Sequence, residues 1–163
     1  TADYEKWSSA SQFILMFLMF IGGSAGSTGG SVKVLRVMIF FKLGKTELKR
    51  LVHPKAIIPV RVDGNVVSTN VIVNVLGFMF FYLAILVFAT IIMNVVGLDL
   101  VSAFASVAAT LGNIGPGLGT VGPTDNYFHI PMIGKWVLAF CMLAGRLEIY
   151  TVLVLFTRDF WKK

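Results

Sequence analysis

Residues 100–119 read LVSAFASVAATLGNIGPGLG, and this stretch decides the fold. Its first part, Leu100–Thr110, is apolar, and Asp99 before it can accept a hydrogen bond at the start of a helix. A membrane-spanning helix needs roughly 20 apolar residues, so this segment covers only about half of a bilayer. The glycine- and proline-rich segment that follows lies at membrane depth, where irregular backbone is tolerated only inside protein or beside water. The stretch predicts a re-entrant hairpin, with a pore helix at 100–111 and a pore loop at 112–118.

Long apolar segments flank this hairpin on both sides. Val71–Leu98 carries no formally charged residue, which predicts a membrane-spanning helix over 70–98. Met132–Phe156 predicts a second spanning helix over 132–157, and the basic and aromatic residues at 158–163 would anchor its inner end at the membrane surface. The predicted fold class is an all-α integral membrane protein built from helix–pore loop–helix units.

A second glycine-rich interruption lies in the N-terminal part of the chain, where GGSAGSTGG at 22–30 separates apolar residues at 13–21 from those at 32–41. Glycine costs roughly 1 kcal/mol relative to alanine inside a helix, so we expect a broken membrane helix within 1–43. The alternative is a helix-packing face, because Gly22 and Gly26 have the GxxxG spacing. The functional interpretation is a flexible loop that acts as a gate in an ion pathway. Its residues would be Gly22, Gly23, Ser24, Ala25, Gly26, Ser27, Thr28, Gly29 and Gly30.

The composition supports a membrane protein and excludes several other classes. Only 13% of the 163 residues are charged, against roughly 25% in soluble domains, and the mean hydropathy is +0.83. Of the 14 Lys and Arg residues, eight lie between Lys33 and Arg61, which predicts a cytoplasmic basic loop at 44–69 and no nucleic-acid partner. The sequence has no catalytic triad, zinc-ligand spacing or phosphate-binding loop, so we expect neither an enzyme nor a bound cofactor. The polar N-terminus, without an initiator methionine or signal peptide, predicts a piece of a longer protein.

The pore loop is the candidate ion site. A dehydrated alkali cation needs oxygen ligands, and backbone carbonyl groups supply them without net charge. Gly115 would permit a backbone conformation that other residues avoid, and the C-terminal end of the pore helix carries partial negative charge that favours a cation. The alternative is a glycine-rich extracellular loop over an ordinary helix bundle. The candidate ion-binding residues are Asn113, Ile114, Gly115, Pro116 and Gly117.

Two opposite charges lie within the last apolar segment. Arg146 and Glu148 are two residues apart, about 200° around a helix, so each needs a partner elsewhere. An intramembrane arginine is costly unless it is paired or faces water. One hypothesis is that the Arg146 side chain contacts the carbonyl and hydroxyl groups of residues 22–30 and holds a gate shut. The alternative is a structural ion pair that joins two helices.

Four local motifs carry a resemblance to a known family. They are IGGSAGSTGGSVKVLR from Ile21, KRLVHP from Lys49, SAFASVAATLGNIGPGLG from Ser102 and GRLEIYTVLVLFTRDFW from Gly145. In these motifs the sequence resembles the Trk/Ktr family of potassium transporters. The resemblance implies four pore repeats around one pathway, of which this chain would supply the end of the third (1–43), a cytoplasmic loop (44–69) and the fourth (70–163).

The resemblance also implies roles for particular residues. Gly115 matches the family's filter glycine, so K⁺, the transported ion, would be held at Asn113, Ile114 and Gly115. Residues 22–30 match the family's intramembrane gate, and Arg146 matches the arginine that contacts it. The expected function is potassium transport across a bacterial inner membrane by a multi-pass protein. The alternatives are a sodium-linked or weakly selective cation transporter and a non-transporting helical membrane component.

The partners that the resemblance implies are membrane lipid, a second copy of the full-length protein, and a cytosolic nucleotide-binding regulatory subunit of the TrkA type. The basic segment Lys42–Arg61 and the tail Arg158–Lys163 would face the side on which such a subunit binds.

Overall fold

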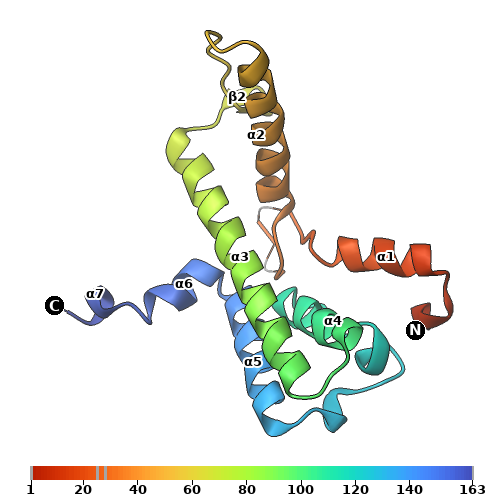
Figure 1. Cartoon of the computed structure of the whole chain (residues 1–163). Helices are drawn as coiled ribbons and strands as arrows, with labels where there is room; N and C mark the ends of the chain where they lie inside the picture. The colour runs from red at the N-terminus through yellow and green to blue at the C-terminus, as the bar shows by residue number, and fades with distance from the viewer. Residues whose placement is uncertain (1, 25, 28, 163) are drawn as a thin grey trace.

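The computed structural model describes residues 2–24, 26–27 and 29–162. Three helices form its centre: α3 (Thr69–Val95), α4 (Leu100–Leu111) and α5 (Met132–Arg146), which pack against one another in pairs (Figure 1). Within the described residues the only strands are β1 (Arg61–Val62) and β2 (Asn65–Val66), which pair as a short antiparallel hairpin. The fold is therefore all-α, as the sequence predicts.

Helix α3 is the long apolar helix of the structure. Among the described residues, it is the one helix that is long and apolar enough to cross a membrane. Its buried face includes Phe78, Tyr82, Leu86 and Met93, which pack into the central core. It ends at Val95, slightly before the predicted boundary, because Gly97 adopts a φ of 114° and turns the chain toward α4.

Helix α4 lies between α3 and α5 and coincides with the predicted pore helix. Asp99 caps its start by accepting a hydrogen bond from the Ser102 backbone N–H at 3.1 Å. The helix ends in a Schellman motif, in which Ile114 N–H donates to the Ala109 carbonyl at 2.8 Å and Asn113 N–H donates to the Thr110 carbonyl at 3.0 Å. Asn113 has a φ of 54°, a left-handed conformation that asparagine tolerates better than most residues. Most of the surface of α4 is buried, because small side chains let its neighbours approach closely. These small buried residues are Ser102, Ala103, Ala105, Ser106, Ala108 and Ala109.

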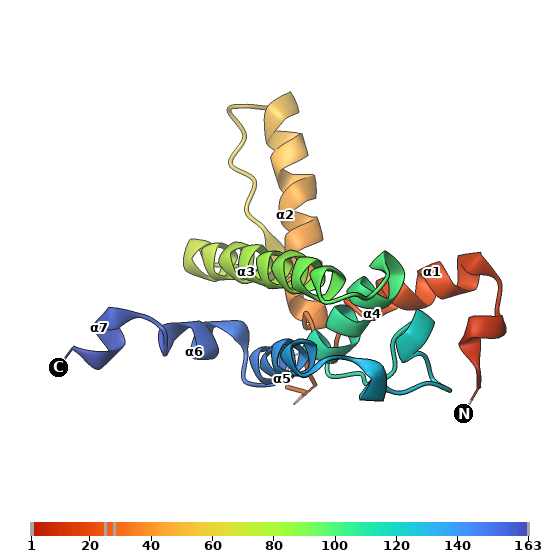
Figure 2. The same cartoon turned by 60° about the horizontal axis from the view of Figure 1, so that its bottom comes forward.

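The prediction of one continuous helix over 132–157 is wrong. Helix α5 ends at Arg146, and Glu148 has a φ of 64°, so the chain leaves the α5 axis before α6 (Ile149–Val154) and α7 (Arg158–Trp161). Figures 1 and 2 both show α6 and α7 extending away from α5. A left-handed non-glycine residue costs about 1–3 kcal/mol. Ion pairs from Glu148 to another helix, described below, offset this cost.

The N-terminal half contains a short turn, η1 (Tyr4–Lys6), and two helices, α1 (Ser9–Leu18) and α2 (Val34–Val52). The predicted basic loop at 44–69 is only partly a loop, because α2 continues through its first residues to Val52. Good helix formers and the Glu47–Arg50 ion pair at 2.6 Å favour this extension, and Pro54 follows its end. Helix α2 packs on α3 and then projects away from the other helices (Figure 2).

Candidate functional site

The glycine-rich loop at 22–30 joins α1 to α2, and its two ends are tied together. Gly22 N–H donates to the Val32 carbonyl at 2.8 Å, and Val32 N–H donates to the Phe20 carbonyl at 3.3 Å. Ser31 has a φ of 66°, and its hydroxyl oxygen lies 2.9 and 2.7 Å from the Met19 and Phe20 carbonyl oxygens, which share its single proton. A Cβ on Gly22 would stand 2.5 Å from the Gly30 carbonyl oxygen, so glycine at position 22 allows the neck of the loop to close.

This loop is not a helix-packing face of small residues. Gly22 and Gly26 have the GxxxG spacing, but neither is helical. The predicted gate residues Ala25 and Thr28 lie outside the described residues. Of the others, Gly23, Ser24, Gly26 and Gly29 are exposed, and Gly30 is buried.

The end of the loop meets the end of α4. A Cβ on Gly30 would stand 2.7 Å from both the Gly112 carbonyl oxygen and the Asn113 side-chain nitrogen. Gly145 of α5 approaches the same place, because a Cβ there would overlap the Leu111 carbonyl oxygen and stand 2.8 Å from the Asn113 nitrogen. The two candidate regions predicted from sequence, far apart in the chain, are therefore in contact.

The pore loop has an exposed tip between buried ends. Ile114, Gly115 and Pro116 are exposed, whereas Gly112, Gly117 and Leu118 are buried. Gly117 N–H donates to the Val121 carbonyl at 2.8 Å, which joins the loop to η2 (Gly119–Val121). A Cβ on Gly117 would stand 3.1 Å from the backbone of Ala105, so glycine lets this end pack against α4.

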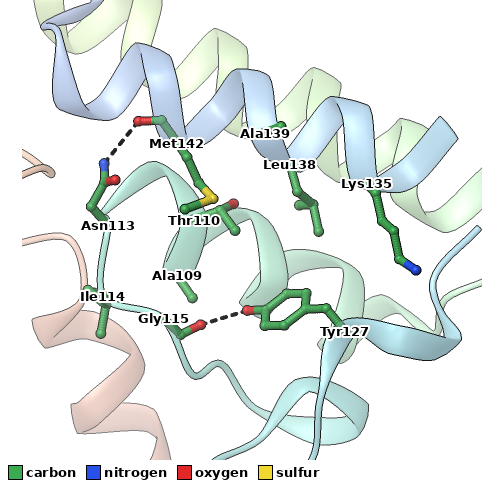
Figure 3. A pocket seen from close by; sticks show the side chains of 10 residues that line it. All are labelled: Ala109, Thr110, Asn113, Ile114, Gly115, Tyr127, Lys135, Leu138, Ala139 and Met142. Atoms are coloured by element: carbon green, nitrogen blue, oxygen red, sulfur yellow. Dashed lines mark hydrogen bonds between the residues drawn. The ribbon is translucent and has the colours of Figure 1, made fainter. Parts of the chain in front are cut away.

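Hydrogen bonds fix the orientation of three groups in the pore loop. The Asn113 side-chain nitrogen donates to the Met142 carbonyl of α5 at 3.1 Å, and the Tyr127 hydroxyl donates to the Gly115 carbonyl at 2.7 Å (Figure 3). The Tyr4 hydroxyl donates to the Gly117 carbonyl at 2.7 Å. Asn113 is thus held to α5 by its side chain, and two backbone carbonyl groups of the loop accept bonds from tyrosines that the sequence interpretation missed.

A pocket of about 370 Å³ lies between the pore loop and α5 (Figure 3). Its walls come from the end of α4, from the pore loop, from η3 (Tyr127–His129) and from α5. The residues around it are Ala109, Thr110, Asn113, Ile114, Gly115, Tyr127, Lys135, Leu138, Ala139 and Met142. No group of three or more His, Cys, Asp or Glu residues that could hold a metal occurs within the described part of the chain.

Glu148 forms an ion-pair cluster with Lys33, the N-cap residue of α2, and with Arg36 in the first turn of that helix. Its carboxylate accepts from Lys33 Nζ at 2.7 Å and from an Arg36 guanidinium nitrogen at 2.9 Å. Arg36 also lies 4.1 Å over the Phe78 ring. The sequence interpretation treated Lys33 and Arg36 as charges that set topology. Glu148 lies more than 100 residues from both cations in the sequence. The only clue to this cluster in the sequence was that an acidic residue within an apolar segment needs a partner elsewhere.

The other predicted gate residue, Arg146, is the last residue of α5 and has an exposed side chain. It directly follows Gly145, the residue that presses against the Leu111 carbonyl and the Asn113 amide. Its backbone therefore lies beside the contact between the glycine-rich loop and the pore loop.

Comparison with known proteins shows which family has this sequence and fold. The family model described as TrkH, cation transport protein, matches residues 1–163. The chain belongs to the TrkH family. This is a family of transport proteins rather than enzymes, in agreement with the sequence interpretation.

Two curated TrkH-family relatives illustrate the similarity. The chain is 42% identical over 163 residues to "Trk system potassium uptake protein TrkH" of Escherichia coli (strain K12), covering 100% of this chain and 33% of that protein. It is 38% identical over 162 residues to "Trk system potassium uptake protein TrkG" of the same strain, covering 99% of this chain and 33% of that protein. The chain thus spans about a third of the length of the curated relatives it matches.

A solved TrkH-family structure has the same fold. The crystal structure of the potassium transporter TrkH from Vibrio parahaemolyticus matches with a TM-score of 0.88 and 43% identity, over 98% of this chain and 34% of that one. The fold class predicted from sequence, an all-α membrane protein, is confirmed by this match.

Proposed function

We propose that this chain is part of the K⁺-translocating subunit of a bacterial Trk-type uptake system. The observation that carries the proposal is the placement of α4. Its 12 residues extend about 18 Å, too short to cross a hydrocarbon core of about 30 Å, and it lies packed between α3 and α5. A half-length helix that packs against a membrane-spanning helix and ends in an exposed backbone loop is the arrangement expected of a pore helix and filter.

The pore loop would provide part of the selectivity filter. Its exposed tip, Ile114–Pro116, follows the C-terminal end of α4, whose dipole favours a cation. The backbone carbonyl groups of the loop would supply the oxygen ligands. We assign K⁺ coordination to carbonyl groups of Asn113, Ile114 and Gly115, with Pro116 and Gly117 completing the loop. Since four repeats would surround the pathway, this chain would supply one quarter of the filter.

The loop at 22–30 would be the gate. Its closed neck at Gly22 and Val32 and its contact with Gly112 and Asn113 support a position next to the filter. Arg146 would contribute a positive charge at the same level, which raises the barrier to a cation until the loop moves.

A weakly selective or sodium-linked transporter is the second candidate function. The observation that favours it is that, within 113–117, the only glycine with a left-handed φ is Gly115, so the stretch of conformationally permissive backbone is short. The flux measurement described below separates the two candidates through the ratio of K⁺ to Na⁺ permeability.

The whole protein would be a multi-pass protein of the bacterial inner membrane and would form a homodimer in lipid. The exposed basic end of α2 and Arg158 of α7 support a cytosolic face for these segments, where a nucleotide-binding subunit of the TrkA type would bind.

The direct test is ion flux through the full-length protein in liposomes, with and without its cytosolic partner. We expect uptake of K⁺ or Rb⁺ down an imposed gradient, at a rate above that of protein-free liposomes. A correctly folded full-length protein that passes neither ion, with the partner present and its nucleotide varied, would refute the proposal.

A further inference from the structure

Two tyrosine hydroxyls donate to alternate carbonyl groups of the pore loop. Tyr127 lies in η3, after the loop, and donates to Gly115; Tyr4 lies in η1, 113 residues before its acceptor, and donates to Gly117. Both bonds are 2.7 Å long, within the usual range for a hydroxyl donor. The loop is thus held from two separate segments of the chain.

Packing alone does not fix the Gly115 carbonyl. A Cβ built on Gly115 would meet nothing within 4 Å, and its φ of 109° lies in a region open to glycine. The next residue, Pro116, has no N–H, so the peptide unit between them can be held only through its carbonyl oxygen. The Tyr127 hydroxyl is the one described hydrogen-bond donor to that oxygen.

Both tyrosines are suited to remain donors. Burial raises the pKa of Tyr127 to about 12, with a smaller contribution from Tyr4. Burial, and then the charge of Glu5, also raise the pKa of Tyr4. Each hydroxyl therefore keeps its proton at physiological pH. The Tyr127 ring packs against the central core, and Asn126 caps η3 by accepting from Phe128 N–H at 3.0 Å.

We propose that Tyr127 and Tyr4 are positioning residues that set the ion selectivity of the pore loop by holding the Gly115 and Gly117 carbonyl groups in fixed directions. A carbonyl that accepts a bond from a phenol is held in one direction, and its oxygen keeps a second lone pair for an ion. A filter whose carbonyl groups can turn inward adapts to the smaller Na⁺, whereas a held filter keeps the spacing that suits K⁺. This inference rests on the proposed function of the pore loop.

The bond from Tyr4 adds a link between repeats. Tyr4 belongs to the segment that would end the third repeat, and Gly117 belongs to the fourth. Gly122 lies directly against the Glu5 carboxylate, so the contact between these two segments extends beyond the single hydroxyl. One filter segment is thus held in place by the repeat before it.

The test uses the full-length protein with Tyr127→Phe, Tyr4→Phe and the control Tyr150→Phe. Tyr150 also donates its hydroxyl to a backbone carbonyl, that of Asn74 at 3.0 Å, but outside the pore loop. The readout is the K⁺ to Na⁺ permeability ratio in liposomes. We expect this ratio to fall about threefold to tenfold in each pore-loop variant, which is the effect of losing one hydrogen bond, and to stay unchanged in the control.

A merely structural role would lower the thermal stability or total flux without changing the ratio. If Tyr127→Phe does not fold, Tyr4→Phe decides the question by the same criterion. An unchanged ratio in the folded variants, in a wild-type background that prefers K⁺, would overturn this inference alone. Absence of any K⁺ flux in the wild type would instead refute the proposed function.

Discussion

Gly30 of the glycine-rich loop lies directly against Asn113 at the end of α4. A Cβ on Gly30 would stand 2.7 Å from the Asn113 side-chain nitrogen, which itself donates to the Met142 carbonyl at 3.1 Å. Three parts of the chain therefore meet at one amide group: the loop between α1 and α2, the end of the pore helix, and α5. Any movement of the loop end must change this contact.

Replacing Gly30 with alanine should push the loop away from α4. The added methyl group would meet a backbone carbonyl oxygen, that of Gly112, which cannot rotate aside. Overpacking of this kind costs about 1–3 kcal/mol, so we expect a lower melting temperature and altered K⁺ flux. Gly26→Ala is the matched control, because a Cβ at Gly26 meets nothing within 4 Å. Equal melting temperatures and equal fluxes for the two variants would contradict the contact.

Replacing Gly115 with serine should weaken discrimination between K⁺ and Na⁺. A side chain at a φ of 109° is strained, so the loop backbone would shift. Gly97→Ser is the control, because Gly97 has a φ of 114° and, like Gly115, open space around its Cβ position. Both variants should lose about 1–3 kcal/mol of stability, but only Gly115→Ser should change the permeability ratio. A ratio equal to wild type in Gly115→Ser would argue against a carbonyl filter here.

Replacing Arg146 with alanine should raise K⁺ flux through the full-length protein. Removing a unit charge that opposes a cation lowers the barrier to the ion, and a decrease of about 1.4 kcal/mol corresponds to a rate increase of about tenfold. Arg146→Lys keeps the charge and should stay near the wild-type rate. The measurement is the initial rate of Rb⁺ uptake per folded protein. Unchanged or lower flux in Arg146→Ala would count against the gate role.

Replacing Glu148 with glutamine should destabilise the junction between α5 and α6. The substitution leaves Lys33 and Arg36 without their carboxylate partner and leaves the left-handed backbone at residue 148 uncompensated. Because these side chains are 21–41% exposed, we expect a loss of only about 1–2 kcal/mol. Glu47→Gln removes an exposed ion pair on α2 and should cost less than about 0.5 kcal/mol. Thermal unfolding in detergent measures the stability of both variants. Equal losses of stability would show that the Glu148 cluster contributes no more than the exposed ion pair on α2.

Replacing Asp99 with alanine should remove the cap of α4 and cost about 1 kcal/mol, whereas Asp99→Asn should cost less. Hydrogen bonds from the side chain and backbone of Ser102 lower the pKa of Asp99. The carboxylate therefore contributes stability that is present above the ordinary aspartate pKa of about 3.9 and is lost as the pH falls through the lower folded-state value. The difference in melting temperature between wild type and Asp99→Ala should shrink below about pH 4. A constant difference down to pH 2 would contradict this assignment.

The local features of the fold were predictable from sequence, and the long-range contacts were not. Helix α4 follows from Asp99, the alanine-rich segment and the Gly112-Asn113 end, all of which act within one helix. The break at Glu148 was missed because Leu147, Glu148 and Ile149 are compatible with a helix, and only partners on α2 favour the left-handed turn. The extension of α2 was missed because its charges were interpreted as topology signals rather than as residues of a helix.

The candidate site shows the same division. Residue type and spacing were enough to propose Gly115 and the glycine-rich loop. The pairing of Gly30 with Asn113 needed the fold, because nothing in either segment specifies the other. The tyrosine contacts could not be predicted for the same reason. The carbonyl group that accepts from Tyr4 lies 113 residues away, and nothing in the sequence around an isolated tyrosine indicates its partner.

The closed neck of the glycine-rich loop has a consequence for its length. Because backbone bonds join Phe20 and Gly22 to Val32, the distance between the ends of the loop is set by the neck and not by the residues between them. Doubling the length of a loop whose ends are already joined costs only about 0.6 kcal/mol. Insertions or deletions between Gly23 and Gly29 should therefore leave α1 and α2 in place.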